Sequence, residues 1–505
     1  MIGPQTPLPP FARRWCHAIP AAMVIGVALA HFAFFGNGLV DDAYITFRYI
    51  ANWYAGHGLV YNPGVPCEGY TNLLWLLLLA GVGKTGLSLE YAAQALGLAL
   101  TVGTMLLVWW QTARQGMRFG VSLLAMALLA TSSIFIHAGV SGLETQLLAF
   151  LTTLAAWLFA GEMQRERAVP WSVAVGMLAY LTRPDAILLP LALVLIWLAS
   201  GKLKEAGGWK WLGWAALVAL GTIAAHIVWR HAYYGEFLPN TFYAKEGGTP
   251  AAFVRGARNL LLFISHSGGA VAWPLVFIAA WRYRSGQFGL VALAFIAARA
   301  AFVLWSGGEW VGLCRFMAPV LPLVFILLAA QFIDIIQGAT TARSRRGVTV
   351  VAAGMLLVLQ LAVALPASKA GREAARALQR MHVVLGHDLA RMGSPTDTVA
   401  TGEAGAIAYF SGLKVLDVFG LNDCAIARTP GPAHCKYAPE YVFGQRPRFF
   451  IIDSGSRHAN GYASRFVIYD RYYNDPRFQR DYKFVREYTV MPEWSLWLFE
   501  RTGGG

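Results

Sequence analysis

Long apolar runs separated by short polar segments occupy residues 19–366. A helix needs about 20 apolar residues to cross about 30 Å of hydrocarbon. The runs that we expect to cross are 19–36, 90–110, 120–137, 146–160, 169–182, 185–200, 211–229, 269–281, 287–305, 316–337 and 348–366. The pattern therefore predicts a polytopic α-helical membrane protein with about eleven spans.

One further run, 73–82 (LLWLLLLAGV), is about half as long as a full span. We interpret it as a short or re-entrant helix that enters from the outer face, because a full crossing would move every later basic segment to the other side. The runs 169–182 and 185–200 are also short. Their merger into one span is the main alternative to this topology.

The pattern changes after residue 366. The segment GREAARALQRMHVVLGHDLARM carries apolar residues at helical spacing. The segments TVATGE, KVLDVFG and PRFFIIDSG predict buried strands, and REYTVMPEWSLWLFER predicts an aromatic-rich hairpin. We therefore divide the chain into a membrane domain, 1–366, and an extracytoplasmic α/β domain, 367–505.

Composition supports the membrane assignment. Hydrophobic residues make up 57% of the 505 residues and charged residues 13%, about half the share usual in soluble domains. These values exclude a disordered chain and an ordinary cytosolic enzyme. The net charge of +14 would fit a nucleic-acid partner, but basic residues gather between apolar runs, as at Arg114 and Arg118 or Arg165 and Arg167. This is the positive-inside pattern, so no nucleic acid is expected.

With the N-terminus inside, the unusual polar residues collect on the outer face. They lie in the first outer loop, 37–72, in later turns and loops at 138–145, 181–185, 230–256 and 306–315, and in the α/β domain. The cytoplasmic loops hold little beyond positive charge. We therefore expect the chemistry on the outer side of the membrane.

The first outer loop contains two adjacent carboxylates, Asp41 and Asp42. Carboxylates at a membrane surface are costly unless they are paired or used. One interpretation is solvated loop charge; the other is catalysis, because a carboxylate beside an apolar wall can accept a proton from a sugar hydroxyl. The same loop holds Arg48, His57, Asn62, Glu68, Tyr70 and Asn72.

Cysteine and histidine spacing gives no metal signature. The five cysteines show no CxxC pair, and no HxxH or HExxH motif occurs. We expect no cofactor and no metal. Cys424 and Cys435 flank a Pro/Gly-rich turn in the outer domain. In an oxidising compartment these two are predicted to form a disulfide.

Several motifs follow one another in a specific order: DDAYITFRYIANWYAGHGLVYNPG, EGYTNLLW, GLET, LTRPD, LPNTFYAK, GGEW and LDVFGLND. Together they resemble the GT-C superfamily of polyprenyl-phosphate-sugar glycosyltransferases. Within it, the chain is most similar to the terminal β-(1→2)-arabinofuranosyltransferase of actinobacterial cell walls and its Gram-negative relatives. The resemblance runs from the first span to the α/β domain.

The resemblance implies inverting transfer of a sugar, with D-arabinofuranose as first choice, from a polyprenyl-phosphate donor. It places the base in the first outer loop, which we assign to Asp41 with Asp42 in support. Glu144 would be a second carboxylate at the cavity, or an acid stabilised by a helix N-terminus. Glu309 stands where relatives commonly carry Asp.

The leaving group of such a reaction is a phosphodiester, which cations stabilise. The candidates are Arg183, Lys245 and Arg315. Arg183 has an alternative role as the partner of Asp185, and Lys245 as an interfacial anchor. The further substrate-binding candidates are Asn240, Tyr243, Glu68, Tyr70, Glu144, Glu309 and His57.

The expected location is the bacterial inner membrane, with the site facing the periplasm. The acceptor would be a glycan, a lipopolysaccharide or a pilin-like protein. One alternative is the same chemistry with a hexose or amino-sugar donor. Another is a non-enzymatic transporter of lipid-linked glycans, which would carry charges in its spans and often internal repeats. The sequence shows few such charges and no repeat.

Overall fold

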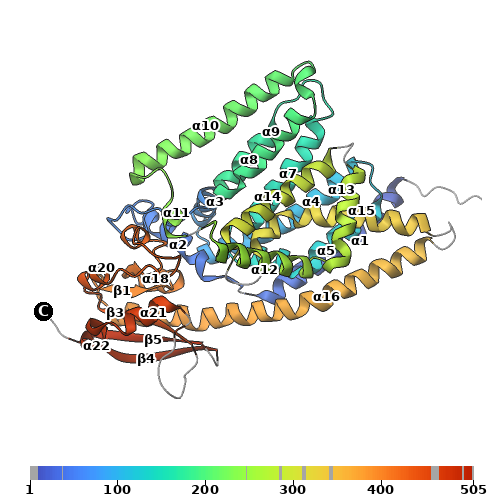
Figure 1. The fold of residues 1–505 in the computed structure, drawn as a ribbon. Coiled ribbons are helices and arrows are strands. Elements are labelled where there is room, and N and C mark those ends of the chain that lie inside the picture. The colour runs from blue at the N-terminus through green and yellow to red at the C-terminus, as the bar shows by residue number, and fades with distance from the viewer. Residues whose placement is uncertain are drawn as a thin grey trace, which may run out of the picture.

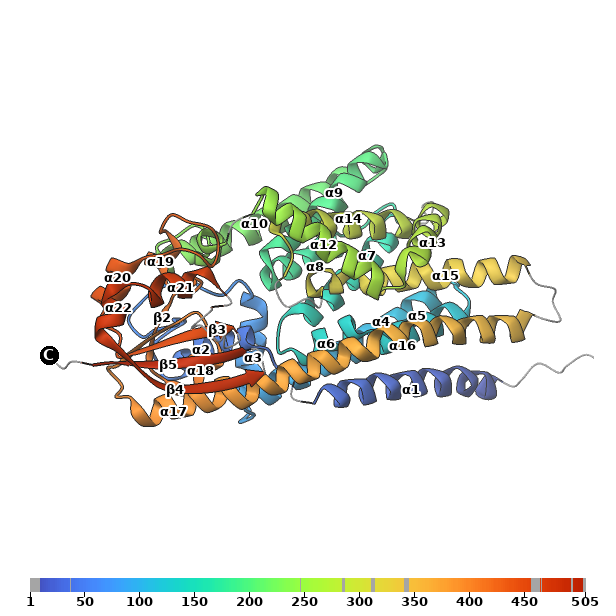
Figure 2. The same ribbon diagram turned by 60° about the horizontal axis from the view of Figure 1, so that its bottom comes forward.

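The computed structural model describes residues 10–36, 38–245, 247–283, 287–309, 314–339, 345–455, 464, 466–491 and 494–502. Its helices form an elongated bundle with a small sheet domain at one end (Figure 1). The long helix α16 (Arg345–Leu378) runs beside α1 (Pro10–Phe35) and enters the sheet domain (Figure 2). This arrangement places the sheet domain at one end of the spans.

The other helices of the bundle are α2 (Asp41–Tyr54), α3 (Leu73–Gly83), α4 (Leu89–Arg114), α5 (Phe119–Thr131), α6 (Ser133–Val140), α7 (Thr145–Glu162), α8 (Trp171–Thr182), α9 (Leu188–Ala199), α10 (Gly208–Tyr234), α11 (Asn240–Ala244), α12 (Pro250–His266), α13 (Gly269–Arg282), α14 (Phe288–Ser306) and α15 (Leu321–Ala339). Short 3₁₀ turns lie at η1 (Pro184–Ile187), η2 (Lys202–Lys204) and η4 (Arg315–Val320). After α16 the chain passes through a π-helical turn, η5 (Gln379–Val383), into α17 (Val384–Met392).

Among the described residues, six helical stretches are long and apolar enough to cross a membrane, or seven if α5 and α6 count as one. The six are α1, α4, α10, α14, η4 with α15, and α16 with its continuation. The expected count of about eleven spans is not confirmed. Several predicted runs form short helices, such as α8 and α9 with 12 residues each. Hydropathy finds apolar segments, but packing decides where a helix ends or bends.

Three local features of the predicted topology can be compared with the helices of the structure. The run 73–82 is the short helix α3, of 11 residues. The predicted span 120–137 is broken at Ser132, where α5 and α6 meet at a bend of 63°. The predicted domain boundary at 366 lies within α16, which continues unbroken past Pro366.

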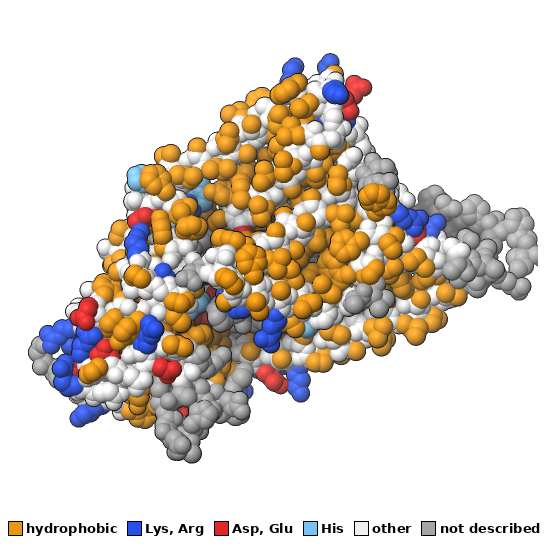
Figure 3. Space-filling model, viewed as in Figure 1, with side chains coloured by type: hydrophobic (Ala, Val, Ile, Leu, Met, Phe, Trp, Pro, Cys, Tyr) orange, Lys and Arg blue, Asp and Glu red, His pale blue; other side chains and the backbone are white. Residues whose placement is uncertain are grey.

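The outer surface of the bundle is apolar. In α10 only 17% of the most apolar 18-residue stretch is buried, and Trp209, Leu217, Leu220 and Val228 are all at least 60% exposed. Hydrophobic side chains cover the bundle in Figure 3, with charged groups gathered toward its ends. A helix that is apolar on its exposed face needs lipid around it. The chain is a multi-pass membrane protein.

The sheet domain contains the strands predicted from the sequence. Its elements are β1 (Thr398–Thr401), α18 (Ala406–Ser411), β2 (Lys414–Asp417), α19 (Cys424–Ala427), α20 (Pro439–Gly444), β3 (Phe449–Gly455), α21 (Val467–Tyr473), α22 (Pro476–Asp481), β4 (Tyr482–Met491) and β5 (Trp494–Arg501). The strand order is β2-β1-β3-β5-β4. The first three strands are parallel, and β5 pairs antiparallel with both β3 and the predicted hairpin partner β4.

The central strand β3 has a continuous apolar sequence in which polar residues do not alternate with apolar ones, and its packing explains why. Phe449 and Ile451 belong to the core that is continuous with the helical bundle, whereas Phe450 and Ile452 belong to a second core. All four are fully buried. A strand covered on both faces has no solvent side on which to place polar residues. The sheet therefore packs against the bundle with one face and against its own helices with the other.

The first outer loop is docked onto the sheet domain. Arg48 donates to the carbonyl oxygens of Ala408 and Leu413, and Asn62 exchanges two hydrogen bonds with the backbone of Val415. Hydrogen bonds from side chains to the backbone hold the loop in one position on the sheet domain, because a broken bond would leave a buried carbonyl without a partner. The loop and the sheet domain thus form one body despite their separation in sequence.

The disulfide prediction is wrong in its pairing. Cys424 bonds to Cys67 of the first outer loop, with 6.1 Å between their Cα atoms and a sequence separation of 357, and Cys435 is a free cysteine. The prediction paired Cys424 with Cys435 because these two cysteines lie close together in the sequence. The docking of the loop, which sequence spacing does not reveal, brings Cys67 to Cys424 instead.

Candidate active site

The two carboxylates of the first outer loop lie at the start of α2. Val40, which precedes the helix, is extended and provides no side-chain cap, and both Asp41 and Asp42 lie in the first turn. Negative charge is stabilised there by the unpaired amides and dipole of the helix N-terminus. The helix therefore holds both carboxylates at the end of the bundle that meets the sheet domain.

Asp41 faces the sheet domain and accepts three hydrogen bonds. They come from His382 Nδ1 at 3.0 Å and from the amides of Gly405 and Ala406 at 2.9 Å each. Burial by itself would raise the pKa of Asp41, but the hydrogen bond and charge of His382 and the two amides outweigh burial and lower it. The Asp41 side chain is 19% exposed.

Two features of the sheet domain make this contact possible. A Cβ at Gly405 would lie 2.0 Å from the backbone oxygen of Asp41 and 2.5 Å from its carboxyl carbon, so only glycine fits. His382 lies on the π-helical turn η5 between α16 and α17. Such turns shift the direction of side chains and recur at functional sites.

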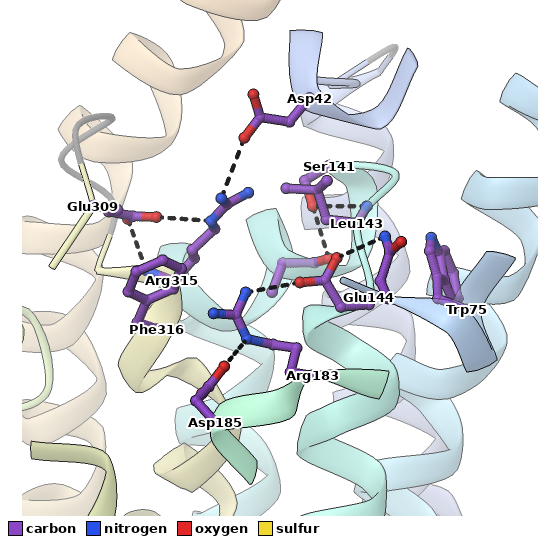
Figure 4. Close-up of polar contacts among 12 residues, drawn as sticks. Asp42, Trp75, Ser141, Leu143, Glu144, Arg183, Asp185, Glu309, Arg315 and Phe316 are labelled. Atoms are coloured by element: carbon purple, nitrogen blue, oxygen red, sulfur yellow. Dashed lines mark hydrogen bonds and ion pairs between the residues drawn. The ribbon is translucent and has the colours of Figure 1, made fainter. Parts of the chain in front are cut away.

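Asp42, the next residue of the helix, points in a different direction, toward a cluster of charged side chains (Figure 4). Its Oδ2 lies 3.3 Å from Arg315, and its side chain is 55% exposed. Arg315 also pairs with Glu309, with Nε 3.1 Å from Oε2, and its backbone amide donates to the same carboxylate at 2.7 Å. The predicted turn 306–315 thus presents a cation to Asp42; its residues 310–313 lie outside the described residues.

Arg183 is the second cation of this cluster. It donates to Glu144 at 2.8 Å and to Asp185 at 2.9 Å, so the predicted partnership with Asp185 is present alongside one with Glu144. Asp185 is also paired with Arg299 from α14. Burial would raise the pKa of Glu144, but the charges of Arg183 and Arg315 outweigh burial and lower it. Both arginines lie over the ring of Phe316.

Lys245 completes the cluster from the loop after α11. Its ammonium group interacts electrostatically with Asp42, Arg315, Arg183 and Glu144. The imidazole of His434, in the sheet domain, interacts electrostatically with Lys245 and Asp42. The sheet domain therefore also faces this cluster. We call Asp42, Glu144, Arg183, Lys245, Glu309 and Arg315 the charged cluster. These six predicted site residues come from five separate segments of the chain.

The other predicted residues are not part of the charged cluster. Buried Glu68 forms an ion pair with Arg230 at 2.5 Å, and the Tyr70 hydroxyl lies 3.1 Å from that of Tyr234. Asn240 donates to the backbone of Gly420 and Leu421. The remaining two are Tyr243, whose backbone oxygen accepts from Lys436, and His57, which is exposed beyond the other end of α2.

Sequence reasoning missed His382, Glu403, Arg299 and Arg230. No motif or spacing marks them, because their partners lie far away in the chain. The one available signal for Arg299 and Arg230 was a charge inside or beside an apolar run, which is costly unless it is paired. His382 carried no comparable signal, since it lies in an amphipathic segment that also contains His387.

In the described part of the chain, one group of acidic and histidine side chains has dimensions suited to a metal ion. It consists of Asp41, His382 and Glu403, whose possible ligand atoms all lie within 4.8 Å of one another. The Nε2 atom of His382 is 3.9 Å from Glu403. The group lies on the Asp41 side of α2, away from the charged cluster.

A family described as a domain of unknown function (DUF8728) matches residues 370–502. No curated protein matches the chain in sequence. ArnT from Cupriavidus metallidurans, in a crystal structure bound to undecaprenyl phosphate, is similar in structure with a TM-score of 0.60 and 15% identity, covering 95% of this chain and 97% of ArnT. The apo state of that protein gives a TM-score of 0.59, at 15% identity, over 97% of this chain and 98% of ArnT.

The oligosaccharyltransferase of Archaeoglobus fulgidus is also similar, with a TM-score of 0.53 and 11% identity over 92% of this chain and 79% of that protein. At such low identity these likenesses show the fold. They agree with the GT-C fold that the sequence motifs implied, and they extend over nearly the whole chain.

Proposed function

We propose that the protein transfers a sugar from a polyprenyl-phosphate donor to an extracytoplasmic acceptor, with inversion at the anomeric carbon. The observation that carries the proposal is the charged cluster. An exposed carboxylate, Asp42, lies beside the cations Arg315, Arg183 and Lys245 at one end of a multi-pass membrane protein. A lipid phosphate at the membrane surface needs such cations, and an acceptor hydroxyl needs such a base.

The cations are the candidates for the donor phosphate. Arg183 and Arg315 are held in place by Glu144, Asp185 and Glu309. Positions fixed in advance stabilise developing negative charge without reorganisation during the reaction. The likeness of the whole chain to ArnT, which was crystallised with undecaprenyl phosphate, supports a polyprenyl-phosphate donor.

We propose Asp42 as the base. Sequence reasoning favoured Asp41 with Asp42 in support, but Asp41 already accepts three hydrogen bonds, whereas Asp42 is more exposed and has one arginine partner. The Asp42 carboxylate takes the proton of the acceptor hydroxyl. The hydroxyl oxygen bonds to the anomeric carbon as the bond from that carbon to the phosphate oxygen breaks, and polyprenyl phosphate leaves.

For the donor sugar we propose D-arabinofuranose, on the resemblance of the sequence motifs, with a hexose or amino sugar as the alternative. We place the protein in a bacterial inner membrane with the charged cluster facing the periplasm. The acceptor is a glycan, a lipopolysaccharide or a pilin-like protein. The concentration of basic residues between the predicted spans supports this orientation.

The test is transfer of label from synthetic polyprenyl-phosphoryl-arabinofuranose in purified membranes that contain acceptor. Wild-type protein should transfer label, and Asp42→Asn protein should not. The matched control is Asp334→Asn, because Asp334 is a partly exposed carboxylate between Arg118 and Arg282, away from the charged cluster. Transfer from a hexose donor alone would overturn the arabinose assignment, and full activity of Asp42→Asn would overturn the base.

A further inference from the structure

One buried amide joins α2 to the cations of the charged cluster without belonging to that cluster. Asn72, the residue before α3, is 7% exposed. Its Nδ2 atom donates to the Thr46 hydroxyl of α2 at 3.1 Å and to Oε2 of Glu144 at 3.3 Å. The other oxygen of that carboxylate, Oε1, accepts from Arg183 at 2.8 Å. We call the chain of contacts from Thr46 through Asn72 and Glu144 to Arg183 the Asn72 bridge.

The α2 end of the Asn72 bridge lies on the face of the helix that carries the proposed base. Thr46 follows Asp42 by four residues, and residues four apart lie on the same face of a helix. Asp42 contacts Arg315, whereas Thr46 contacts Asn72. This face of α2 therefore meets the surroundings of the charged cluster at two points about one helical turn apart.

The neighbours of Asn72 determine which way its amide points. The carboxylate of Glu144, which is paired with Arg183, only accepts hydrogen bonds, so Nδ2 rather than Oδ1 must face it. The NH2 group has two hydrogens, one for each acceptor of the bridge. Within the described part of the chain, no donor forms a hydrogen bond with the buried Oδ1 atom. The donor side of the amide therefore sets its orientation.

Asn72 does not perform the usual role of an asparagine at its position. It is the N-cap residue of α3, where an asparagine side chain commonly accepts a hydrogen bond from an amide of the first turn. The described structure has no such bond at Asn72. A cap would stabilise the end of α3 alone, whereas the observed contacts reach α2 and the residue before α7. The side chain therefore fixes the relation between three helices.

The backbone of the turn before α7 is held independently of Asn72. The amide of Val40, just before α2, donates to the Ser141 oxygen at 3.1 Å. Trp75 of α3 donates to the Gly142 oxygen at 3.0 Å and lies on the same side of the cluster as Glu144 (Figure 4). With the backbone fixed in this way, the part of the turn that the bridge orients is the carboxylate of Glu144.

We propose that Asn72 is a positioning residue that fixes the base relative to the site of the donor phosphate. Through the Asn72 bridge, the helix that carries Asp42 keeps one position relative to the cation Arg183. Attack by the acceptor oxygen needs both substrates aligned, and a misplacement of about 1 Å can lower a rate about 10²-fold. The inference rests on the proposed function and deepens it, because it adds a residue that acts through Glu144 and α2.

The first experiment replaces the amide by a carboxylate of the same shape. Asn72→Asp removes both donated hydrogen bonds and places two carboxylates side by side. The kcat for transfer per folded molecule should fall about 10- to 100-fold, with each KM changed less than about twofold, because alignment of bound substrates matters in the transition state. An unchanged kcat would overturn the proposal. A higher KM for donor at unchanged kcat would assign Asn72 to donor binding and would also overturn it.

The second experiment restores the bridge with donor and acceptor exchanged. In Asn72→Asp/Glu144→Gln, the amide at position 144 can accept from Arg183 with its oxygen and donate to the carboxylate at position 72 with its nitrogen. Asn72→Asp should therefore lower kcat about 10- to 100-fold in the wild-type background but less than about threefold in the Glu144→Gln background. An equal loss in both backgrounds would overturn the bridge.

The matched control is Asn52→Asp, which changes an asparagine of the same helix away from the charged cluster. Asn52 donates from Nδ2 to the backbone oxygens of Val60 and Tyr61. The variant also loses two amide hydrogen bonds, so its melting temperature should fall, but its kcat per folded molecule should equal that of wild type. A loss of kcat as large as that of Asn72→Asp would show a general structural effect and would overturn the positioning role.

Hydrogen exchange separates this inference from the proposed function. In protein without substrate, Asn72→Asp should speed amide exchange about twofold or more in peptides that cover 43–50 and 144–150, as measured by mass spectrometry. Asn52→Asp should leave 144–150 unchanged. If wild-type protein transfers sugar from no lipid-linked donor, the proposed function fails, and faster exchange in both peptides still supports the bridge. Unchanged exchange in either peptide of Asn72→Asp would overturn the bridge even where transfer is present.

Discussion

Asp41 and Asp42 are adjacent in sequence but lie in two different regions. On one side of α2, Asp41 is enclosed by His382 and two backbone amides of the sheet domain. On the other side, Asp42 is largely exposed and faces cations held by other carboxylates. The same chemical group therefore has two different settings, one that fixes a carboxylate and one that leaves it free to react.

This difference shows how a domain far away in the chain can prepare a reactive group. The contacts of Asp41 fix the first turn of α2, and that turn sets the direction of Asp42. A base held in place in advance loses little entropy in the reaction. We infer that the Asp41 side positions the helix, whereas the Asp42 side contacts the substrate.

The largest expected effect separates the two carboxylates by kinetics. Asp42→Asn should lower kcat for transfer by about 10²- to 10⁴-fold, the usual contribution of a general base, with little change in thermal stability. Asp41→Asn should lower kcat much less and lower stability more. Steady-state kinetics and thermal unfolding of both variants test this contrast. A larger kcat loss in Asp41→Asn would return the base to Asp41.

The disulfide should contribute the next largest effect. Cys67→Ser combined with Cys424→Ser should lower the free energy of unfolding by about 2–4 kcal/mol, because the bond joins the first outer loop to the sheet domain. Cys435→Ser is the matched control and should change stability by less than about 0.5 kcal/mol. Non-reducing peptide mapping should recover a Cys67–Cys424 peptide. Recovery of a Cys424–Cys435 peptide would contradict the structure.

Removal of the Asp41 charge should have a smaller effect on stability. Asp41→Asn leaves the amides of Gly405 and Ala406 facing a neutral oxygen or an amide nitrogen, at a cost of about 1–3 kcal/mol. Chemical denaturation of the purified protein measures this cost. The exposed Asp42→Asn substitution serves as the internal comparison. Equal stability of the two variants would mean that Asp41 does not fix the helix.

The same carboxylate predicts a pH dependence. An aspartate of an unfolded chain titrates near pH 3.9. Because the pKa of folded Asp41 is lowered, its stabilising effect is complete above about pH 4 and is lost as pH falls through the folded-state value. Melting temperatures of wild type and Asp41→Asn should therefore converge below about pH 4. A difference in melting temperature that does not shrink as pH falls below about 4 would show that the charge is not responsible.

The smallest expected effect is that of a chelator. Since Arg183, Arg315 and Lys245 surround the place assigned to the donor phosphate, we expect transfer rates to be the same with and without EDTA. Loss of transfer in EDTA, with recovery on addition of a divalent cation, would contradict this expectation. It would direct attention to Asp41, His382 and Glu403, whose possible ligand atoms lie close together.

The sequence predicted features that depend on nearby residues. Apolar runs located the helices, and the strands of the sheet domain lie where continuous apolar segments such as FFII occur. The motifs that carry the resemblance also named Asp42, Arg183 and Arg315 as site candidates, and the fold brings these three side chains into one cluster. Local patterns are sufficient for such features, since hydrophobic burial acts along each segment.

Features that depend on distant contacts were not predictable. Cys424 pairs with Cys67 rather than with Cys435, and Asp41 pairs with His382, only because the first outer loop docks on the sheet domain. Glu68 was a site candidate on its chemistry, but the fold places it against Arg230. Asp41 and Asp42 have different contacts because they occupy different faces of α2. The sequence does not show which face meets the sheet domain and which meets the charged cluster.

The docking of the first outer loop also has a consequence for biogenesis. The residues that Arg48 and Asn62 contact, Ala408, Leu413 and Val415, are translated more than 300 residues later. The start of α2 therefore leaves the ribosome long before the segment that orders it has been made and translocated. Until then the nascent chain lacks the contacts that enclose Asp41, so the first turn of α2 takes its final position only after the sheet domain has been made.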